Sequence, residues 1–298
     1  MERHFTLLSG ERGVLQIEGA DRREFLQGLV TNDVAKLGSD RALYAALLTA
    51  QGRYLHDFFL AEHGETFLLD VEAARLADLA RRLTTYKLRS RVSLKPVSEY
   101  WAVAVAFGAE PLSALELSSE PGAAAKIAGG VAFVDPRLVA LGARLILPRA
   151  TAAAVMEARG FLPAEPDAYD RLRLSLGVPD GSRDLLPERA LLLESGFDEL
   201  NGIDWNKGCY IGQELTARTK YRGLVKKRLL PVAVEGPLPQ PGAIVFWGDE
   251  EAGEMRSSRG GNGLALLRLD ALERASKETP LRAGEARLSV TIPAWAKL

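Results

Sequence analysis

Cysteine and histidine are scarce in this sequence, which contains one cysteine and three histidines in 298 residues. A single cysteine excludes an intramolecular disulfide and is typical of a reducing compartment. His4, His56 and His63 lie far from Cys209 in the chain and lack the spacing of metal ligands. Because a structural zinc site takes about four Cys or His ligands, the sequence offers no such site of its own.

Long apolar runs and an excess of one charge are also missing. No run approaches the roughly 20 residues that a membrane-spanning helix needs. The first residues, Met-Glu-Arg-His-Phe, lack the apolar core of a secretory signal. We therefore expect no membrane association and a cytoplasmic location. The net charge of -1 argues against a surface that binds nucleic acid throughout.

The length predicts two or three domains, since one hydrophobic core rarely grows to this size. Gly64-Glu-Thr-Phe-Leu-Leu aligns with Gly142-Ala-Arg-Leu-Ile-Leu, and a helical pattern follows each segment. This repeat favours two similar α+β halves related by a pseudo-twofold axis, which we place at 1–97 and 98–223. From 224 to 298, short strand-like runs separated by Gly and Pro predict a small barrel or sandwich.

Local signals are clear at the start of the chain and weak in its middle. Asp21 is expected to open a helix, with Glu24 in the capping-box position. That helix ends at a polar elbow, residues 31–33. The Ala- and Gly-rich stretch 108–130 predicts a loop or a weak helix and is the least informative part of the sequence.

The segment 205–214 reads Trp-Asn-Lys-Gly-Cys-Tyr-Ile-Gly-Gln-Glu and contains the only cysteine, Cys209. Glu214 followed by Arg218 has the charge order of a short helix, and Cys209 would lie just before it. Helix N-H groups and Lys207 would then lower the thiol pKa, and a thiolate can attack an electrophile or bind a soft metal. The alternative is a buried cysteine that packs as a small hydrophobic side chain. The polar flanks favour the functional interpretation.

Residues 207–228 hold seven basic residues and one acidic residue. An RNA-binding strip that includes Tyr221 is one interpretation. A solvated face that also docks a protein partner is favoured, because the total charge is near zero. Upstream, Glu194 interrupts the apolar stretch 187–197. It either faces a pocket or lies on a solvated turn, and the sequence leaves both open.

The segment 207–214 resembles the signature of the YgfZ family, folate-binding proteins of iron-sulfur cluster assembly that share a fold with the aminomethyltransferase (T-protein) of the glycine cleavage system. Further similar segments are 25–28, 31–33, 51–53, 193–195 and 221–223. Residues 193–195 and 214–219 are most similar to the branch with mitochondrial members. The resemblance implies an α+β fold, in which two pseudo-twofold-related halves enclose a folate pocket, and a C-terminal β-barrel.

The resemblance also implies roles for individual residues. Glu194 would bind the pterin ring, and a carboxylate can accept two N-H bonds from an aminopterin edge. T-proteins have paired aspartates where this sequence has His56-Asp57, so only Asp57 remains to act on a folate. The catalytic candidates are Cys209, Lys207, Glu214 and Asp57. The candidates for folate binding are Glu194, Asn32, Asp33, Arg173 and Arg218.

The leading hypothesis is a monomeric, tetrahydrofolate-binding factor that assembles or repairs 4Fe-4S clusters. Clusters usually take four protein ligands, so Cys209 would share a transient iron-sulfur cluster with a partner, such as an A-type carrier, or act by thiol chemistry. Client 4Fe-4S enzymes would receive the product. One alternative is a folate-dependent aminomethyl transferase that uses Asp57. Another is an RNA-binding protein linked to tRNA modification, which contacts tRNA through the basic segment.

Overall fold

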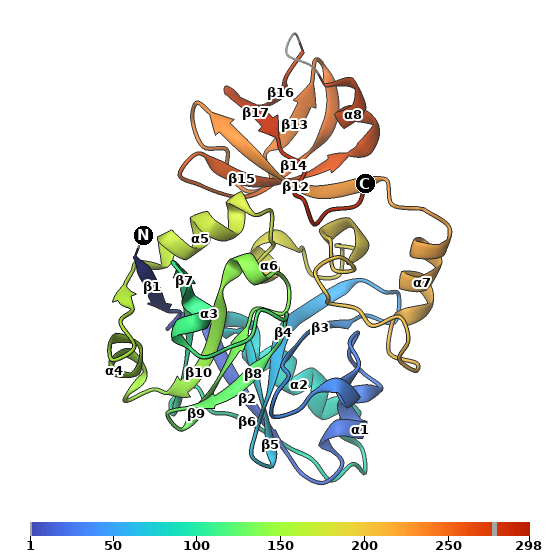
Figure 1. Ribbon diagram of the computed structural model, residues 1–298. Coiled ribbons are helices and arrows are strands. Elements are labelled where there is room, and N and C mark those ends of the chain that lie inside the picture. Colours follow the sequence, from blue (N-terminus) through green and yellow to red (C-terminus); the bar gives the residue numbers. More distant parts are fainter. Residues whose placement is uncertain (1, 276–278) are drawn as a thin grey trace. The chain divides into compact units, whose positions relative to one another are not determined.

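The computed structural model describes residues 2–275 and 279–298. These residues form two compact units, each of which is built from separate stretches of the chain (Figure 1). The first unit comprises the chain up to Leu48, Leu55–Tyr169 and Leu200–Ile211, and the second comprises Thr49–Tyr54, Asp170–Glu199 and the chain from Gly212. The predicted division at 97 and 223 stays a prediction.

The first unit contains two β-sheets. The strands of the five-stranded sheet are, in spatial order, β3 (Leu43–Leu48), β4 (Tyr54–His63), β5 (Thr66–Glu72), β2 (Arg12–Glu18) and β6 (Ser93–Pro96). Those of the six-stranded sheet are β11 (Leu162–Pro163), β1 (Arg3–Leu7), β7 (Trp101–Gly108), β10 (Ala143–Pro148), β9 (Gly130–Val134) and β8 (Ala124–Ile127).

Short helices accompany the two sheets. The α-helices are α1 (Arg22–Gln27), α2 (Leu76–Lys87), α3 (Pro111–Ala114) and α4 (Ala152–Glu157), and the 3-10 helices are η1 (Val34–Lys36), η2 (Ala73–Arg75) and η3 (Val139–Leu141). In the predicted repeat, β5 leads to α2 and β10 leads to α4. The strand-to-helix step is therefore confirmed in both halves of the repeat.

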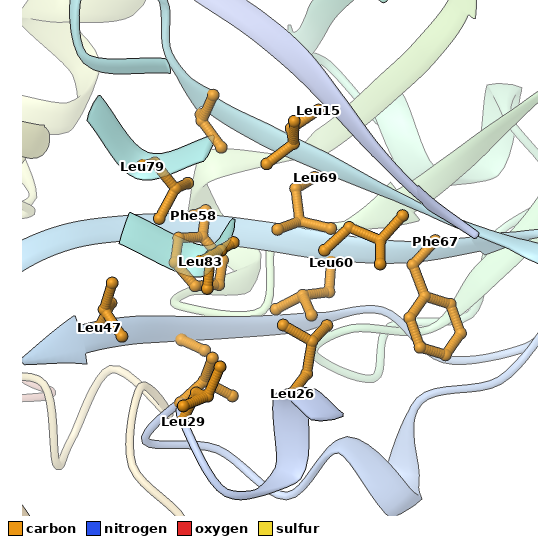
Figure 2. Close-up of a cluster of buried hydrophobic side chains, with 14 of the residues drawn as sticks. Leu15, Leu26, Leu29, Leu47, Phe58, Leu60, Phe67, Leu69, Leu79 and Leu83 are labelled. Atoms are coloured by element: carbon orange, nitrogen blue, oxygen red, sulfur yellow. The ribbon is translucent and has the colours of Figure 1, made fainter. Parts of the chain in front are cut away.

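The core of the five-stranded sheet follows directly from the periodicity of the sequence. On β5, Phe67 and Leu69 alternate with residues of the opposite face and point into the apolar cluster in Figure 2. On α2, Leu79 and Leu83 are four residues apart and reach the same cluster. Sheet and helix thus bury one shared apolar interface.

The opposite face of β5 carries a buried charge. Asp70 accepts hydrogen bonds from the Nε atoms of Arg12 on β2, at 2.6 Å, and Arg144 on β10, at 2.9 Å. All three side chains are buried. Arg144 belongs to the six-stranded sheet and Asp70 to the five-stranded sheet. The carboxylate therefore connects the two sheets of the first unit.

The second unit contains a closed β-barrel, which confirms the barrel in the predicted fold class. Its strands are, in spatial order, β12 (Lys227–Glu235), β15 (Asn262–Arg268), β14 (Glu250–Arg259), β13 (Ile244–Trp247), β16 (Leu281–Ala283) and β17 (Ala286–Val290). The helices of this part of the chain are α5 (Pro166–Ser175), which begins in the first unit, α6 (Gly181–Asp184), η4 (Leu193–Ser195), α7 (Gln213–Tyr221) and α8 (Leu269–Arg274).

Some local predictions differ from the structure. Asp21 precedes α1 but makes no capping hydrogen bond with its side chain. Its carboxylate instead accepts a hydrogen bond from the backbone N-H of Arg91 at 2.7 Å, and the Arg91 guanidinium binds it as well. The stretch 108–130, predicted as a loop or a weak helix, contains the short helix α3 and, in addition, the strand β8, which was not predicted. In the described part of the chain, no helix is both long and apolar enough to span a membrane.

Substitution of Asp70 by Asn tests the connection between the sheets. Asp70→Asn removes the carboxylate that the buried Arg12 and Arg144 share, and Arg144 keeps the longer ion pair with Asp135 at 3.9 Å, so we expect the free energy of unfolding to fall by about 3–5 kcal/mol. Glu18→Gln is the control, because Glu18 forms a surface ion pair with Lys95, and its effect should stay within about 0.5 kcal/mol. Urea denaturation measures both. Similar losses in the two variants would contradict the role of Asp70.

Candidate functional site

Lys207 attaches residues 205–211, which we call the cysteine segment, to the rest of the first unit. Its Nζ atom donates hydrogen bonds to the backbone carbonyls of Gln27, Val30 and Asn32, at 2.8, 2.5 and 2.9 Å. Burial lowers the pKa of Lys207 to about 8. The negative charges of Asp33 and Asp204 act in the opposite direction and raise it. The ammonium group thus occupies a cradle of carbonyl oxygens, which gives Lys207 the role of an anchor.

The polar elbow, residues 31–33, also binds the part of the chain that leads to the cysteine segment. Thr31 donates its hydroxyl hydrogen to the carbonyl of Gly202 at 2.6 Å, and Asn32 donates to the carbonyls of Tyr44 and Asn201, each at 2.8 Å. The Asp33 carboxylate caps η1, because it accepts a hydrogen bond from the backbone N-H of Ala35 at 3.1 Å. Asn32 and Asp33 therefore have structural partners, and their role in folate binding stays a prediction.

Cys209 is free and exposed. The alternative of a buried, hydrophobic cysteine is therefore wrong. Tyr210 next to it is buried, and its hydroxyl has no hydrogen-bond partner among the described residues. Helix α7 begins only at Gln213, after Gly212 in a left-handed conformation with φ of 82°. The thiol is thus available to a molecule outside the chain.

Within residues 2–275 and 279–298, no group of three or more His, Cys, Asp or Glu side chains could hold a metal ion. A metal or cluster at Cys209 would need ligands from a partner. That role of Cys209 stays a prediction.

Glu214 and Arg218 lie on α7 in the second unit and bind each other. Arg218 donates to the Glu214 carboxylate at 2.8 Å, and the Glu214 side chain is 83% exposed. A pair at this spacing stabilises a helix by a few tenths of a kcal/mol. Catalysis by Glu214 and folate binding by Arg218 stay predictions.

The His56-Asp57 pair lies in the first unit, and both side chains are buried. Asp57 accepts a hydrogen bond from the Tyr44 hydroxyl at 2.8 Å. His56 lies 2.9 Å from the Asp78 carboxylate. Burial, with Arg75 nearby, lowers the pKa of His56 to about 4, so its imidazole is neutral at pH 7. The residue before Asp57 therefore carries a neutral ring and not a second carboxylate.

Glu194 lines a cavity of about 260 Å³ in the second unit, together with Arg53, Arg189, Ser195, Lys227, Glu254 and Arg256. Its carboxylate is partly buried and accepts no hydrogen bond from a residue that the structure describes. Burial raises the pKa of Glu194, and Lys227 and Arg53 oppose this effect. A carboxylate without a donor suits a ligand that brings N-H groups, as an aminopterin edge does. The residues present therefore fit a pterin.

Arg173 does not line this cavity. It is buried in the second unit and forms ion pairs with Asp170 and Asp184, each at 2.6 Å. These carboxylates neutralise its charge, as burial of a guanidinium requires. The structure thus gives Arg173 a role in packing, and its role in folate binding stays a prediction.

A second cavity, which the sequence did not reveal, lies in the first unit beside the cysteine segment. It has a volume of about 420 Å³, and Asn32, Arg41, Trp205 and Asn206 are among its lining residues. Lys36 forms an ion pair with Asp204 at 2.5 Å in the same wall. The only signal for it in the sequence was the polar run directly before Lys207.

Two family descriptions match the chain. Residues 226–298 match the family described as "CAF17, C-terminal beta-barrel domain". Residues 11–120 match the "GCVT N-terminal domain". The barrel and the α+β region thus each have a known counterpart.

The chain is similar over most of its length to proteins named "Iron-sulfur cluster assembly factor IBA57, mitochondrial". The mouse and human proteins are each 36% identical to it, over 95% of this chain and 83% of theirs. The Neurospora crassa homolog is 35% identical, over 77% of this chain and 54% of its own. These names contradict the expected cytoplasmic location, because they point to the mitochondrion.

Among solved structures, the chain is similar to the glycine cleavage system aminomethyltransferase T from Bartonella henselae. The TM-score is 0.76, with 99% of this chain and 86% of that chain covered and 16% sequence identity. At this identity the likeness shows the fold alone. It confirms the predicted fold class.

Substitution of Lys207 by Met tests its role as an anchor. Lys207→Met leaves three carbonyls of the cradle without their donor, so the free energy of unfolding should fall by about 1–3 kcal/mol. Amide hydrogen exchange over 201–210 should become faster, while Lys126→Met on β8 changes neither. The rate at which Cys209 reacts with a disulfide reagent should change by less than about threefold. A large fall in that rate with unchanged stability would instead make Lys207 the partner of the thiolate.

Proposed function

The chain belongs to the IBA57 family of iron-sulfur cluster assembly factors, and from this premise we propose that it assembles or repairs 4Fe-4S clusters through Cys209 and a partner protein. The observation that carries the proposal is the exposed single thiol on an anchored segment. The names of the relatives support action in the mitochondrion. The resemblance of 207–214 to the YgfZ signature supports the same use of the cysteine.

The thiol acts by sharing a cluster, because one cysteine supplies only one of the four ligands that a cluster usually takes. In the simplest step, the Cys209 thiolate binds an iron atom as one thiolate of the partner leaves it. Charge and iron oxidation state are then unchanged, and no outside electron donor is needed. An A-type carrier is the partner that we propose, and 4Fe-4S enzymes are the clients. The protein itself is proposed to be a monomer.

Tetrahydrofolate is the proposed ligand of the cavity in the second unit. The carboxylate of Glu194 would accept the N-H groups of the pterin edge, and this assignment rests on its lack of a donor and on its partial burial. The fold that the chain shares with an aminomethyltransferase is a second support. Folate would supply a one-carbon unit or a redox-active pterin, and the chain's residues would bind and orient it.

Two alternative functions, aminomethyl transfer and RNA binding, can each be tested. Aminomethyl transfer would rely on Asp57, but this carboxylate is buried and already accepts a hydrogen bond from Tyr44. Turnover of an aminomethyl donor that is lost on Asp57→Asn and kept on Cys209→Ser would favour a transferase. Salt-dependent tRNA binding by the purified protein would favour the RNA-binding alternative.

Cys209→Ser tests the function of the thiol. The substitution replaces the sulfur with an oxygen that binds iron poorly in clusters, so cells that carry only this variant should lose activity of their 4Fe-4S enzymes. Ser289→Ala on the exposed face of β17 also changes a single side-chain position and should leave that activity unchanged. Normal 4Fe-4S enzyme activity in the Cys209→Ser cells would refute the proposal.

Glu194→Gln tests the folate site. Loss of the charge-assisted hydrogen bonds should weaken tetrahydrofolate binding about tenfold or more, as measured by titration calorimetry. Because burial raises the pKa of Glu194 in the folded protein, its ionised form opposes folding, and stability falls as pH rises through that pKa. The variant should therefore melt at a higher temperature at pH 7.

The control for this experiment is Glu235→Gln at the exposed end of β12, which should change neither folate affinity nor melting temperature. Wild-type affinity for tetrahydrofolate in Glu194→Gln would show that Glu194 does not bind the pterin. A lower melting temperature in that variant would show that the carboxylate has a structural partner.

A further inference from the structure

The cavity that Glu194 lines also presents positive charges. Arg53, Arg189 and Lys227 are in its wall, and every residue of that wall belongs to the second unit. Arg53 and Lys227 oppose the rise in the pKa of Glu194, yet neither forms an ion pair with it within the described ranges. The carboxylate and the cations of this cavity are therefore held apart from each other.

The remaining charged side chains of the wall are paired within the protein. Arg256 binds Glu254 at 2.7 Å, and Asp184 binds the buried Arg173 at 2.6 Å. Each pair is close to neutral as a unit, because opposite charges at hydrogen-bond distance largely cancel. These four side chains thus contribute little net charge to the cavity.

Arg189 and Lys227 differ from them, because neither side chain has a hydrogen-bond or ion-pair partner in residues 2–275 or 279–298. Arg53 lies next to Arg189, since its guanidinium donates to the backbone carbonyl of Arg189 at 2.9 Å. The backbone fixes this arrangement, because the N-H of Tyr54 donates to the carbonyl of Ala190 at 3.0 Å. Three positive charges therefore line the cavity together with one carboxylate that lacks a donor.

The size of the cavity limits how much of a folate it can enclose. Its volume is about 260 Å³, which is below the roughly 300–1,000 Å³ of sites that enclose a whole drug-sized ligand. If the pterin ring lies inside at Glu194, the aminobenzoyl and glutamate parts extend out of the cavity. Of the described residues that line it, only Arg189 and Lys227 are exposed. These two cations therefore mark its open side.

We propose that Arg189 and Lys227 bind the glutamate carboxylates of the folate tail, so that the site prefers folates with a γ-linked polyglutamate tail. The inference rests on the proposed function, because it concerns the same ligand. Each glutamate added to the tail brings one more carboxylate, and a guanidinium can hold a carboxylate with two parallel hydrogen bonds. The tail lies on the open side of the cavity, so the wall does not limit its length.

The presence of unpaired side chains of both signs favours this ligand over a simple anion. A phosphate or an RNA backbone would bind the cations but would leave the partly buried Glu194 without a donor. A folate offers N-H groups at its pterin end and carboxylates at its glutamate end. It therefore provides a partner for Glu194 and for the two exposed cations at once.

Anaerobic titration calorimetry with three ligands tests the proposal. Tetrahydropteroate has no glutamate, tetrahydrofolate has one, and tetrahydropteroyl triglutamate has a γ-linked chain. The wild-type protein should bind the triglutamate about tenfold or more tightly than tetrahydrofolate, and tetrahydropteroate most weakly. Arg189→Gln with Lys227→Gln should bind the triglutamate and tetrahydrofolate within about twofold of each other and keep the wild-type affinity for tetrahydropteroate.

Arg282→Gln with Arg287→Gln is the matched control, because it removes two exposed positive charges of the same unit, on β16 and β17, that do not line the cavity. It should keep the preference for the triglutamate. Lys227→Arg should keep it as well, since the positive charge remains. Equal wild-type affinities for the triglutamate and tetrahydrofolate, or an equal loss of preference in the control, would overturn the proposal.

The folate assignment and the tail assignment can fail separately. If Glu194→Gln weakens binding of tetrahydrofolate but the wild type shows no preference for the triglutamate, only the tail assignment fails. The compound p-aminobenzoyl triglutamate has the tail without the pterin. If it binds the wild type but not the Arg189 and Lys227 variant, while tetrahydropteroate does not bind, the tail assignment stands and the pterin assignment fails. If none of these compounds binds, both fail.

Discussion

The pairing of Asp70 with Arg12 and Arg144 is the constraint on which the first unit depends. Three charged side chains are buried there, and a buried charge is tolerated only when it is paired and hydrogen-bonded. Since Arg144 comes from the other sheet, one carboxylate fixes how the two sheets of this unit lie together. The guanidinium of Arg144 also lies 4.0 Å from the centre of the Phe59 ring, which extends the contact into β4.

Hydrogen bonds within the first unit connect the cysteine segment to the five-stranded sheet. Strand β3 holds the polar elbow, because the backbone N-H of Ala46 donates to the Thr31 hydroxyl at 2.9 Å and Asn32 donates to the carbonyl of Tyr44. The elbow in turn supplies one of the carbonyls that Lys207 binds. The thiol is therefore carried two residues beyond a fixed point. A rigidly presented, exposed thiol suits a protein whose chemistry takes place with a partner.

The parts that sequence could predict are those set by local patterns. The repeat that begins at Gly64 and Gly142 gave the two strand-to-helix steps correctly, and Gly- and Pro-separated runs gave the barrel. The capping role of Asp21 was wrong, because Arg91, 70 residues away, binds its carboxylate. Lys207 meets carbonyls 175 to 180 residues away, and no periodicity carries that information. The exposure of Cys209 was predictable from its polar neighbours, whereas the cradle of Lys207 required the fold.

The central claim is that Cys209 completes a cluster together with a partner, and native mass spectrometry tests it most directly. The protein would be mixed anaerobically with a purified A-type carrier, ferric iron, sulfide and dithiothreitol, which reduces the part of the iron that a 4Fe-4S cluster holds as ferrous iron. The account predicts a complex of both proteins that holds an iron-sulfur cluster and is absent with Cys209→Ser. A cluster found only on the carrier, with this protein unbound, would contradict the account.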